Sequence, residues 1–450
     1  MTTMAKNSFL KNTYITLVRQ ITSIIIGFLL IMIIARVLGS TLQGHYGIIT
    51  TFAATLVMMI NMGWNISTVY YVSKEEVSVQ QAFYNNLLIG IFLSVVGIAG
   101  GFAFIALFGG GASFDQIPDK SSVYLILFAI PFMLLNTFFQ TIFQGIQDFK
   151  IFNTILVFTQ ISNLLFVLFL VVIFNLGLQG ALFAFILGHV ATFLFIITVF
   201  LKKFSFSKQD LKLNVPYLKK SFRYGFKSYL SNLVTFFNYR INVYILYAFA
   251  SPAAFGVYFT ALNLSEKLSV FTQSISSVLL PRIASMGTEE ERNRLTSIVS
   301  RFTMIFMAAF SLVVFLLIDI IVPILGNDYL ETPFLIKVLL PGISLLAVEK
   351  ILSNDIAARG KPEVNLYVSI FNVVLSTILN LILIPEYKAT GAAIATSISY
   401  SLSFLIKSFL FKRITGEKLS GFLLIKPADI VLLRKLINQF KNKLQRRHSG

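Results

Sequence analysis

Long apolar runs separated by short polar breaks dominate this chain. A helix that crosses the hydrocarbon core of a bilayer needs about 20 mostly apolar residues, and runs of this length follow one another along the sequence. They predict membrane-spanning helices over about residues 13–36, 46–72, 84–108, 122–147, 152–175, 179–201, 225–250, 253–280, 297–325, 333–357, 364–384 and 389–411. The pattern predicts an all-α, polytopic membrane protein with about twelve transmembrane helices.

The basic residues in the polar breaks predict the orientation. Cytoplasmic loops retain an excess of Lys and Arg. If the N-terminus is inside, the inside breaks hold most of the basic residues, whereas the outside breaks hold only Arg36, Lys120 and Lys388. An even number of spans then returns the chain to the same side, so we expect both termini to be cytoplasmic.

The chain also repeats itself. Residues 43–46 read Gln-Gly-His-Tyr and recur as Phe-Gly-Val-Tyr at 255–258, an offset of 212. The pair Gly-Ala at 180–181 recurs at 391–392, an offset of 211. Agreement to within one residue predicts two parallel halves of about six helices each. We therefore expect an N-terminal lobe over 1–201, a basic cytoplasmic linker over 202–221, a C-terminal lobe over 222–411 and a cytoplasmic tail over 412–450.

The tail is too polar to span a membrane. Leu433, Ile437, Phe440 and Leu444 recur at helical spacing, and basic residues occupy the other positions. This pattern predicts a basic amphipathic helix that lies on anionic membrane lipids. A disordered basic tail held near the membrane by charge alone remains an alternative.

Composition narrows the possible chemistry. Hydrophobic residues make up 56% of the chain and charged residues only 12%, with a mean hydropathy of +0.81, whereas soluble proteins contain about 25% charged residues. There is no cysteine, and the three histidines are scattered, so we expect no disulfide, metal site or cofactor. The net charge of +18 lies in loops and tail, which favours a membrane surface over nucleic acid as a partner.

Polar residues inside the expected spans are the best candidates for function. A charged side chain in the membrane costs several kcal/mol, so those that occur usually line a cavity or pair with one another. The second half carries charge at this depth and the first half carries mainly amides. The candidate cavity residues are Asn238, Arg240, Asn242 and Tyr244 in the seventh span, Glu266, Lys267 and Gln273 in the eighth, Glu349 and Lys350 in the tenth, Asn61 and Asn65 in the second, and Asn136 and Gln140 in the fourth.

Arg240 is the strongest candidate to bind a sugar or a phosphate, because it is deep and flanked by amides and tyrosines. The alternative is that these residues only hold the helices together by hydrogen bonds and ion pairs, for instance between Arg240 and Glu266.

Several segments resemble one transporter family. They are Arg36–Gly39 with Gly44–Gly47, Phe237–Asn242, Phe255–Glu266, Leu280–Ile283, Ala358–Pro362 and Asn380–Thr396. With these segments the chain resembles the polysaccharide-transporter branch of the multidrug, oligosaccharidyl-lipid and polysaccharide exporter superfamily, which includes O-antigen and capsule-unit flippases. Relatives often carry an acidic residue where this chain has Asn242, so a same-helix partner for Arg240 is missing here.

The resemblance implies a V-shaped bundle of two six-helix lobes that opens alternately to each side of the cell membrane. It also implies a polyprenyl-diphosphate-linked oligosaccharide as cargo, moved from the inner to the outer leaflet for cell-surface polysaccharide biosynthesis. Glycosyltransferases and a polymerase of such an assembly pathway would then be partners.

Two other functions are weighed against a flippase. A cation-coupled exporter of drugs or metabolites needs an intramembrane carboxylate; the first six spans hold none, although Glu266 keeps the possibility open. A membrane-embedded polymerase or glycosyltransferase needs catalytic acids in a sizeable outside loop. The longest outside break, about 109–121, offers only Asp115 and Asp119. We therefore expect a transporter and not an enzyme.

Overall fold

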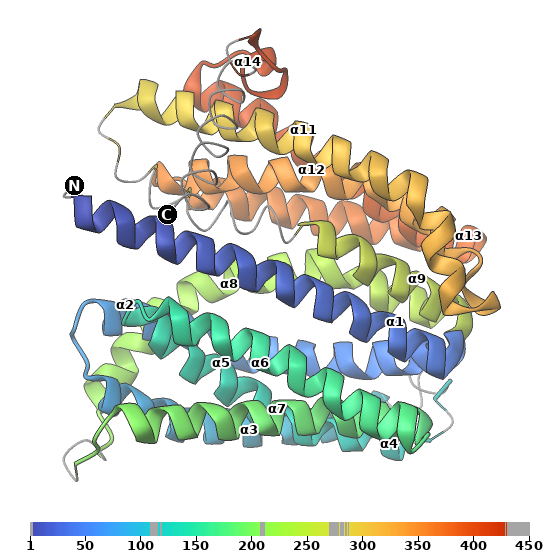
Figure 1. Ribbon diagram of the computed structural model, residues 1–450, viewed down its shortest axis with the longest axis horizontal. Helices are drawn as coiled ribbons and strands as arrows, with labels where there is room; N and C mark the ends of the chain where they lie inside the picture. The colour runs from blue at the N-terminus through green and yellow to red at the C-terminus, as the bar shows by residue number, and fades with distance from the viewer. Residues whose placement is uncertain are drawn as a thin grey trace, which may run out of the picture.

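The computed structural model describes residues 3–108, 116–117, 119–207, 212–269, 279, 283, 286, 288–427 and 429; for 3–21 and 227 it describes the backbone alone. The described part is all-helical (Figure 1). Its helices are α1 (Thr3–Asn61), α2 (Trp64–Ser73), α3 (Val79–Phe108), α4 (Ser121–Leu125), η1 (Ile126–Ala129), α5 (Ile130–Gly145), α6 (Phe149–Val167), η2 (Leu168–Ile173), α7 (Gly177–Lys203), α8 (Val215–Phe249), α9 (Pro252–Glu266), η3 (Lys267–Ser269), α11 (Glu289–Ile321), η4 (Val322–Leu325), η5 (Asn327–Tyr329), α12 (Thr332–Ala358), α13 (Pro362–Thr415) and α14 (Leu419–Leu423).

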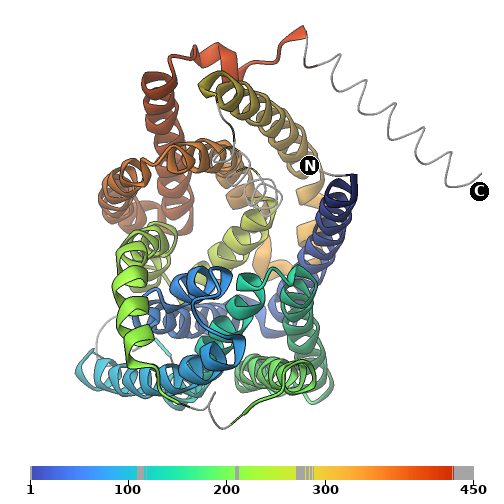
Figure 2. The same ribbon diagram turned by 90° about the vertical axis from the view of Figure 1, so that its left-hand side faces the viewer.

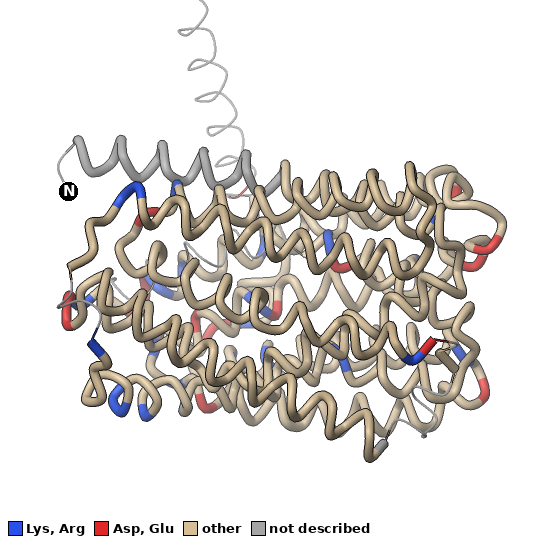
Figure 3. The backbone as a smooth tube through the Cα atoms, turned by 90° about the horizontal axis from the view of Figure 1, so that it is seen from below, with Lys and Arg blue, Asp and Glu red and all other residues tan. Residues whose placement is uncertain are grey.

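The long helices run side by side, and most are apolar along much of their length. Seven of them in the described part are long and apolar enough to cross a membrane: Thr22–Asn61, Val79–Leu107, Ser121–Gly145, Phe149–Ile173, Gly177–Lys203, Glu289–Leu325 and Pro362–Thr415. Figure 3 shows long stretches of the tube that carry no charged residue. The fold is therefore that of a polytopic helical membrane protein, as the apolar runs predict.

Two of the long helices are kinked. Gly39 in α1 has a φ of 71°, a conformation that favours glycine because it carries no Cβ. Lys388 kinks α13 with a φ of 50°. After Gly39 the helix resumes at Ser40, earlier than the expected start at residue 46, so the segment around Gln43 is helical and not part of a loop.

The helices form two groups joined through α1, α8 and α9 (Figures 1 and 2). Helices α3, α5, α6 and α7 pack together in the first group, and α11, α12 and α13 in the second. Helix α1 packs against α9, and α8 packs against both α2 and α13.

A set of polar contacts, which we call the latch, joins the two groups at the end of the bundle that carries both kinks. The latch consists of Arg36, Ser40, Asp328 and Tyr329. The Asp328 carboxylate accepts hydrogen bonds from the Ser40 backbone N–H at 3.2 Å and from its hydroxyl at 3.3 Å. The Tyr329 hydroxyl donates to the Ala35 carbonyl at 3.1 Å, and the Arg36 guanidinium donates to a carbonyl of η4.

The repeated glycines meet beside the latch. A Cβ on Gly44 would lie 2.1 Å from the Pro252 carbonyl oxygen, and one on Gly256 would lie 1.9 Å from the Ser40 carbonyl oxygen. Ser40 and Pro252 are related by the same offset of 212 as the two glycines. The contact between α1 and α9 is therefore formed by equivalent positions of the two halves, and it leaves no room for a side chain at either glycine.

The chain after α13 is anchored by a buried ion pair. Arg301 of α11 donates to Asp429 at 2.6 Å from Nε and 2.7 Å from Nη2, and Phe422 of α14 packs on Phe411. The expected amphipathic helix over 433–444 lies outside the described residues.

We expect Asp429→Asn to loosen this anchor. The Arg301 hydrogen bonds hold the pKa of the Asp429 carboxyl below its ordinary value, so the pair is intact at neutral pH and its stabilisation is lost only as pH falls through that lowered pKa. Losing a hydrogen bond to a charged group costs about 1.5–3 kcal/mol. Amide hydrogen exchange of residues 421–427 should therefore become faster at pH 7 in Asp429→Asn. Glu363→Gln, an exposed carboxylate at the start of α13, should leave it unchanged, and equal exchange in both variants would contradict the anchoring role.

Candidate functional site

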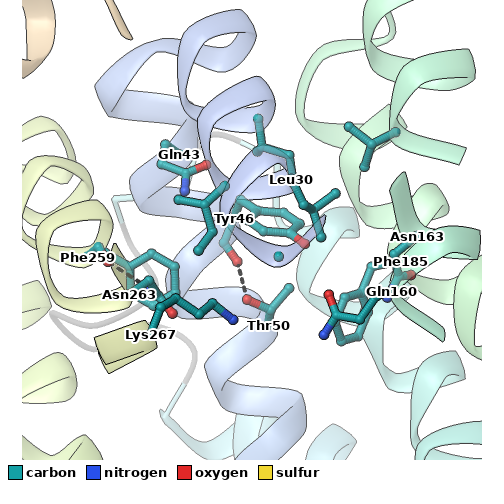
Figure 4. A pocket seen from close by; sticks show the side chains of 14 residues that line it. Leu30, Gln43, Tyr46, Thr50, Gln160, Asn163, Phe185, Phe259, Asn263 and Lys267 are labelled. Carbon is teal, nitrogen blue, oxygen red and sulfur yellow. Dashed lines mark hydrogen bonds between the residues drawn. The ribbon is translucent and has the colours of Figure 1, made fainter. Parts of the chain in front are cut away.

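A polar cavity of about 230 Å³ lies between the two groups of helices (Figure 4). Its walls come from both segments of α1 around the Gly39 kink, from α6 and α7, and from α9 and η3. The polar side chains that line it are Gln43, Tyr46, Thr50, Gln160, Asn163, Asn263 and Lys267. Because its walls belong to both halves of the chain, the cavity must change shape if the halves move.

Lys267 is the only charged residue among the described residues that line this cavity. Figure 4 shows its side chain reaching into the space from one side, with Gln160 facing it from the other. A Cβ on Gly27 would lie 3.0 Å from Lys267 Nζ and 3.4 Å from Gln160 Oε1, so the glycine makes room for both. Among the described residues no carboxylate lies within ion-pair distance of Lys267.

Two amide oxygens of the cavity are also without partners in the described part. Gln43 Oε1 and Asn163 Oδ1 are buried and accept no hydrogen bond. Thr50 and Asn263 instead donate to carbonyls of their own helices, at 2.7 Å each. A buried acceptor without a donor costs free energy. Both oxygens are covered by protein atoms, and a Cβ on Gly188 would lie only 1.7 Å from Asn163 Oδ1, so a ligand could reach them only after the surrounding helices shift.

Arg240, the strongest candidate from the sequence, is paired. Its guanidinium donates to both carboxylate oxygens of Glu266 at 3.2 Å each, in the two-pronged geometry that Arg favours. Both side chains are half-buried. This is the interhelical ion pair that the sequence leaves open as an alternative, and it occupies the guanidinium face expected to meet an anion.

We expect the Arg240–Glu266 pair to stabilise the packing of α8 on α9. Arg240→Gln leaves Glu266 without its partner and should lower the thermal unfolding temperature, because an unpaired, partly buried charge is unfavourable. Removing one partner of a fully buried ion pair costs about 3–5 kcal/mol, and we expect a smaller loss here because both side chains are 26% exposed. Adding Glu266→Gln should restore most of this loss. Scanning fluorimetry in detergent measures both. A double variant less stable than Arg240→Gln would contradict this role.

The amides beside Arg240 form contacts between helices. Asn238 accepts from Asn372 of α13 at 2.8 Å. Asn242 donates to the Tyr258 hydroxyl at 2.6 Å and to the Thr396 hydroxyl at 2.9 Å. These contacts tie α8 to α9 and α13. Tyr244, also expected in the cavity, instead hydrogen-bonds Thr55 of α1 at 2.5 Å.

Two adjacent charged residues of α12, Glu349 and Lys350, have different surroundings. Glu349 is buried and forms an ion pair with Lys407 of α13, a residue not singled out from the sequence. Lys350 lies over the Tyr239 ring, 5.6 Å from its centroid, and no carboxylate lies within ion-pair distance of it in the described part of the chain. We call Arg240, Glu266, Lys267, Glu349, Lys350 and Lys407 the charged cluster. Its four cations and two carboxylates give it an excess of two positive charges.

The candidates of the first half lie apart from the cavity lining. Asn136 donates to the His189 carbonyl at 2.9 Å and Gln140 to the Phe152 carbonyl at 3.3 Å. Asn61 accepts from the Gly63 N–H at 3.2 Å, where α1 ends. Asn65 is half-buried in α2, and Gln273 lies outside the described residues.

Of the sequence candidates that the structure describes, only Lys267 lines the cavity. The structure adds Gln43, Tyr46, Thr50, Gln160, Asn163 and Asn263. Gln160 and Asn163 carried a usable signal, since they are polar residues three apart in an apolar run and share a helix face. Gln43 was missed because its segment was expected to be a loop.

The family model described as polysaccharide biosynthesis protein matches residues 9–287, more than half of the chain. The chain belongs to this family. The resemblance to the polysaccharide-transporter branch of the exporter superfamily is thereby confirmed, and the chain is a multi-pass cell-membrane protein of a flippase-type transporter family.

Two relatives of this chain have names that describe a function. The probable low-salt glycan biosynthesis flippase Agl15 of Haloferax volcanii is 24% identical over 246 residues, which cover 53% of this chain and 50% of Agl15. The chain therefore spans about half the length of this relative. The capsular polysaccharide biosynthesis protein CapF of Staphylococcus aureus is 21% identical, over 90% of this chain and 99% of CapF.

Two solved structures share the fold of the family. An inward-facing multidrug resistance MATE family transporter has a TM-score of 0.70 at 13% identity, covering 88% of this chain and 98% of that one. The lipid II flippase MurJ, in an inward closed conformation, has a TM-score of 0.69 at 17% identity, covering 95% and 93%. At these identities the likeness concerns the fold alone.

Proposed function

We propose that this protein is a flippase that moves a polyprenyl-diphosphate-linked oligosaccharide repeat unit from the inner to the outer leaflet for cell-surface polysaccharide biosynthesis. The observation that carries the proposal is Lys267, which has no carboxylate partner in the described part of the chain. It lies in a cavity whose other described polar groups are neutral. A diphosphate needs a cation, and a glycan needs amide and hydroxyl partners. This cavity offers both.

The named relatives support this substrate class. Agl15 is named a probable glycan biosynthesis flippase and CapF a capsular polysaccharide biosynthesis protein. Carrier lipids that bring glycans through a membrane are amphiphiles with an anionic link. The excess positive charge of the charged cluster suits such a link better than it suits a cationic drug.

We further propose that the chain crosses the membrane about twelve times, as two six-helix lobes with both termini in the cytoplasm. The kinks at Gly39 and Lys388 support this number, because each divides a helix of more than 50 residues into two membrane-length parts. In this orientation the latch lies on the outer side, and the described conformation is closed to the outside.

Transport then proceeds by alternating access. The cavity takes up its ligand while the latch is closed, and the latch must open for release outside. Moving an anionic group outward across a membrane that is negative inside is favourable by about 2.3 kcal/mol per charge per 100 mV. The membrane potential therefore suffices to drive export without a nucleotide.

A cation-coupled exporter is the second candidate. The observation that favours it is the fold, which a multidrug transporter shares. Its carboxylate would be Glu266, but Arg240 already neutralises this side chain, which leaves it poorly suited to bind a sodium ion or a proton.

Reconstituted vesicles distinguish these two functions. We expect the purified protein to speed up translocation of a fluorescent polyprenyl-diphosphate-linked disaccharide, and an imposed potential, negative inside, to increase the rate. We expect no uptake of ethidium driven by a sodium or proton gradient. Gradient-driven ethidium transport without sugar-lipid translocation would overturn the proposal in favour of the exporter.

A further inference from the structure

An apolar groove of about 250 Å³ lies next to the polar cavity and shares Lys267 with it. Ile24 and Phe28 of α1 form one wall. Leu264 and Leu268 form the base, and Val314 and Leu317 of α11 form the other wall. Apart from Lys267 and Ser265, the described residues that line the groove are all apolar.

The groove opens sideways towards the surroundings of the bundle. Its base is buried, with Leu264 and Leu268 each 7% exposed, whereas Val313 and Leu317 on its rim are 49% and 44% exposed. Both rim residues belong to a helix apolar enough to span the membrane. The rim therefore faces lipid, and the base reaches the charged side chain in the interior.

The two walls come from opposite halves of the chain. Helix α1 contacts the second group near α11 through η4 and η5, at the latch end. Away from the latch the groove separates α1 from α11.

We propose that this groove holds the first isoprene units of the carrier lipid, with the diphosphate at Lys267 and the sugars in the polar cavity. The inference rests on the proposed function and specifies which part of the substrate lies in each space. The order of the three spaces supports this occupant. The polar cavity, Lys267 and the apolar groove are adjacent in the same order as the glycan, the diphosphate and the hydrocarbon chain of the substrate.

The main effect of the groove is to position the lipid substrate, not to increase its affinity. An isoprenoid chain that moves from the bilayer into the groove exchanges one apolar environment for another, so its burial in the groove alone gives little affinity. Its effect is to fix where the first isoprene units lie, and thereby to bring the diphosphate to Lys267. A lipid whose chain cannot enter the groove would present its phosphate away from the lysine.

Adjacent leucines of α11 provide a matched pair for the test. Leu317 lines the groove, whereas Leu316 is 63% exposed and does not. A photo-reactive benzoylphenylalanine is placed at either position in the full-length protein, in nanodiscs of phosphatidylethanolamine and phosphatidylglycerol, with radiolabelled farnesyl diphosphate as the probe. We expect cross-linking at 317 to exceed that at 316 by roughly tenfold, the ratio that a site preference of 1.4 kcal/mol gives. Adding Lys267→Gln should abolish the preference.

Other outcomes overturn the groove assignment without touching the function. Equal cross-linking at 316 and 317 means that the probe samples bulk lipid. Loss of the preference when phosphatidylglycerol content is raised means that an ordinary phospholipid occupies the groove. In either case the vesicle assay decides the proposed function independently. Within that assay, Leu317→Trp should slow sugar-lipid translocation and Leu316→Trp should not.

Discussion

Replacing Lys267 by Gln should slow translocation of a lipid-linked oligosaccharide by about 10- to 100-fold. The estimate follows from the loss of one hydrogen bond to a charged group, worth about 1.5–3 kcal/mol. The substitution shortens the side chain by one atom and removes the only charge among the described residues that line the cavity. The initial rate of sugar-lipid translocation in vesicles, normalised to the amount of folded protein, measures the effect.

Two variants serve as controls for Lys267→Gln. Lys267→Arg keeps the charge and should retain a substantial part of the rate, whereas a purely structural role for the lysine would make the larger guanidinium as harmful as Gln. Lys361→Gln removes an exposed lysine at the start of α13 and should have no effect. A Lys267→Gln protein that transports at the normal rate would remove the lysine from the substrate site.

Gly256→Val should nearly abolish transport, by preventing the latch end from closing. A Cβ at this position would lie 1.9 Å from the Ser40 carbonyl oxygen and 2.9 Å from the Gly44 nitrogen. Both are backbone atoms that cannot rotate away. Over-packing of this kind costs about 1–3 kcal/mol or more, which shifts the equilibrium about 5- to 150-fold away from the closed end.

Spin labels can follow this shift, because the chain has no cysteine of its own. Labels at Val37 and Leu330, exposed residues on the two sides of the latch, should report a longer separation in Gly256→Val than in the parent. Gly100→Val is the matched control, since a Cβ on Gly100 meets nothing within 4 Å. An unchanged distance distribution with normal transport would show that the glycine crossing is not needed for closure.

Much of the fold can be predicted from the sequence, because each membrane helix is determined by the length and periodicity of its own run of apolar residues. The apolar runs predict the helices, and the repeat at an offset of 212 matches the positions at which Gly44 and Gly256 meet. The prediction that the second span starts at residue 46 was wrong in detail. The helix resumes at Ser40, where Asp328, almost 300 residues away, accepts from the Ser40 N–H that the Gly39 kink leaves exposed.

The site was less predictable, because it depends on which partners the helices bring together. A single sequence cannot distinguish Arg240, which Glu266 occupies, from Lys267, which lacks a carboxylate partner in the described part. Lys407 was overlooked because a lysine near the end of a span resembles an ordinary flanking cation. The cavity amides on α6 were visible as a pattern, but their position opposite Lys267 comes only from the packing.

Translocation by a protein whose latch can be locked is the most direct test of flipping by alternating access. Ser40→Cys and Asp328→Cys together place two unique thiols at the latch, and a short bismethanethiosulfonate reagent joins them reversibly. We predict that the cross-linked protein stops moving the polyprenyl-diphosphate-linked disaccharide, that a thiol reductant restores the rate, and that neither single-cysteine variant is inhibited. Undiminished translocation by the fully cross-linked protein would contradict alternating access through this end of the bundle.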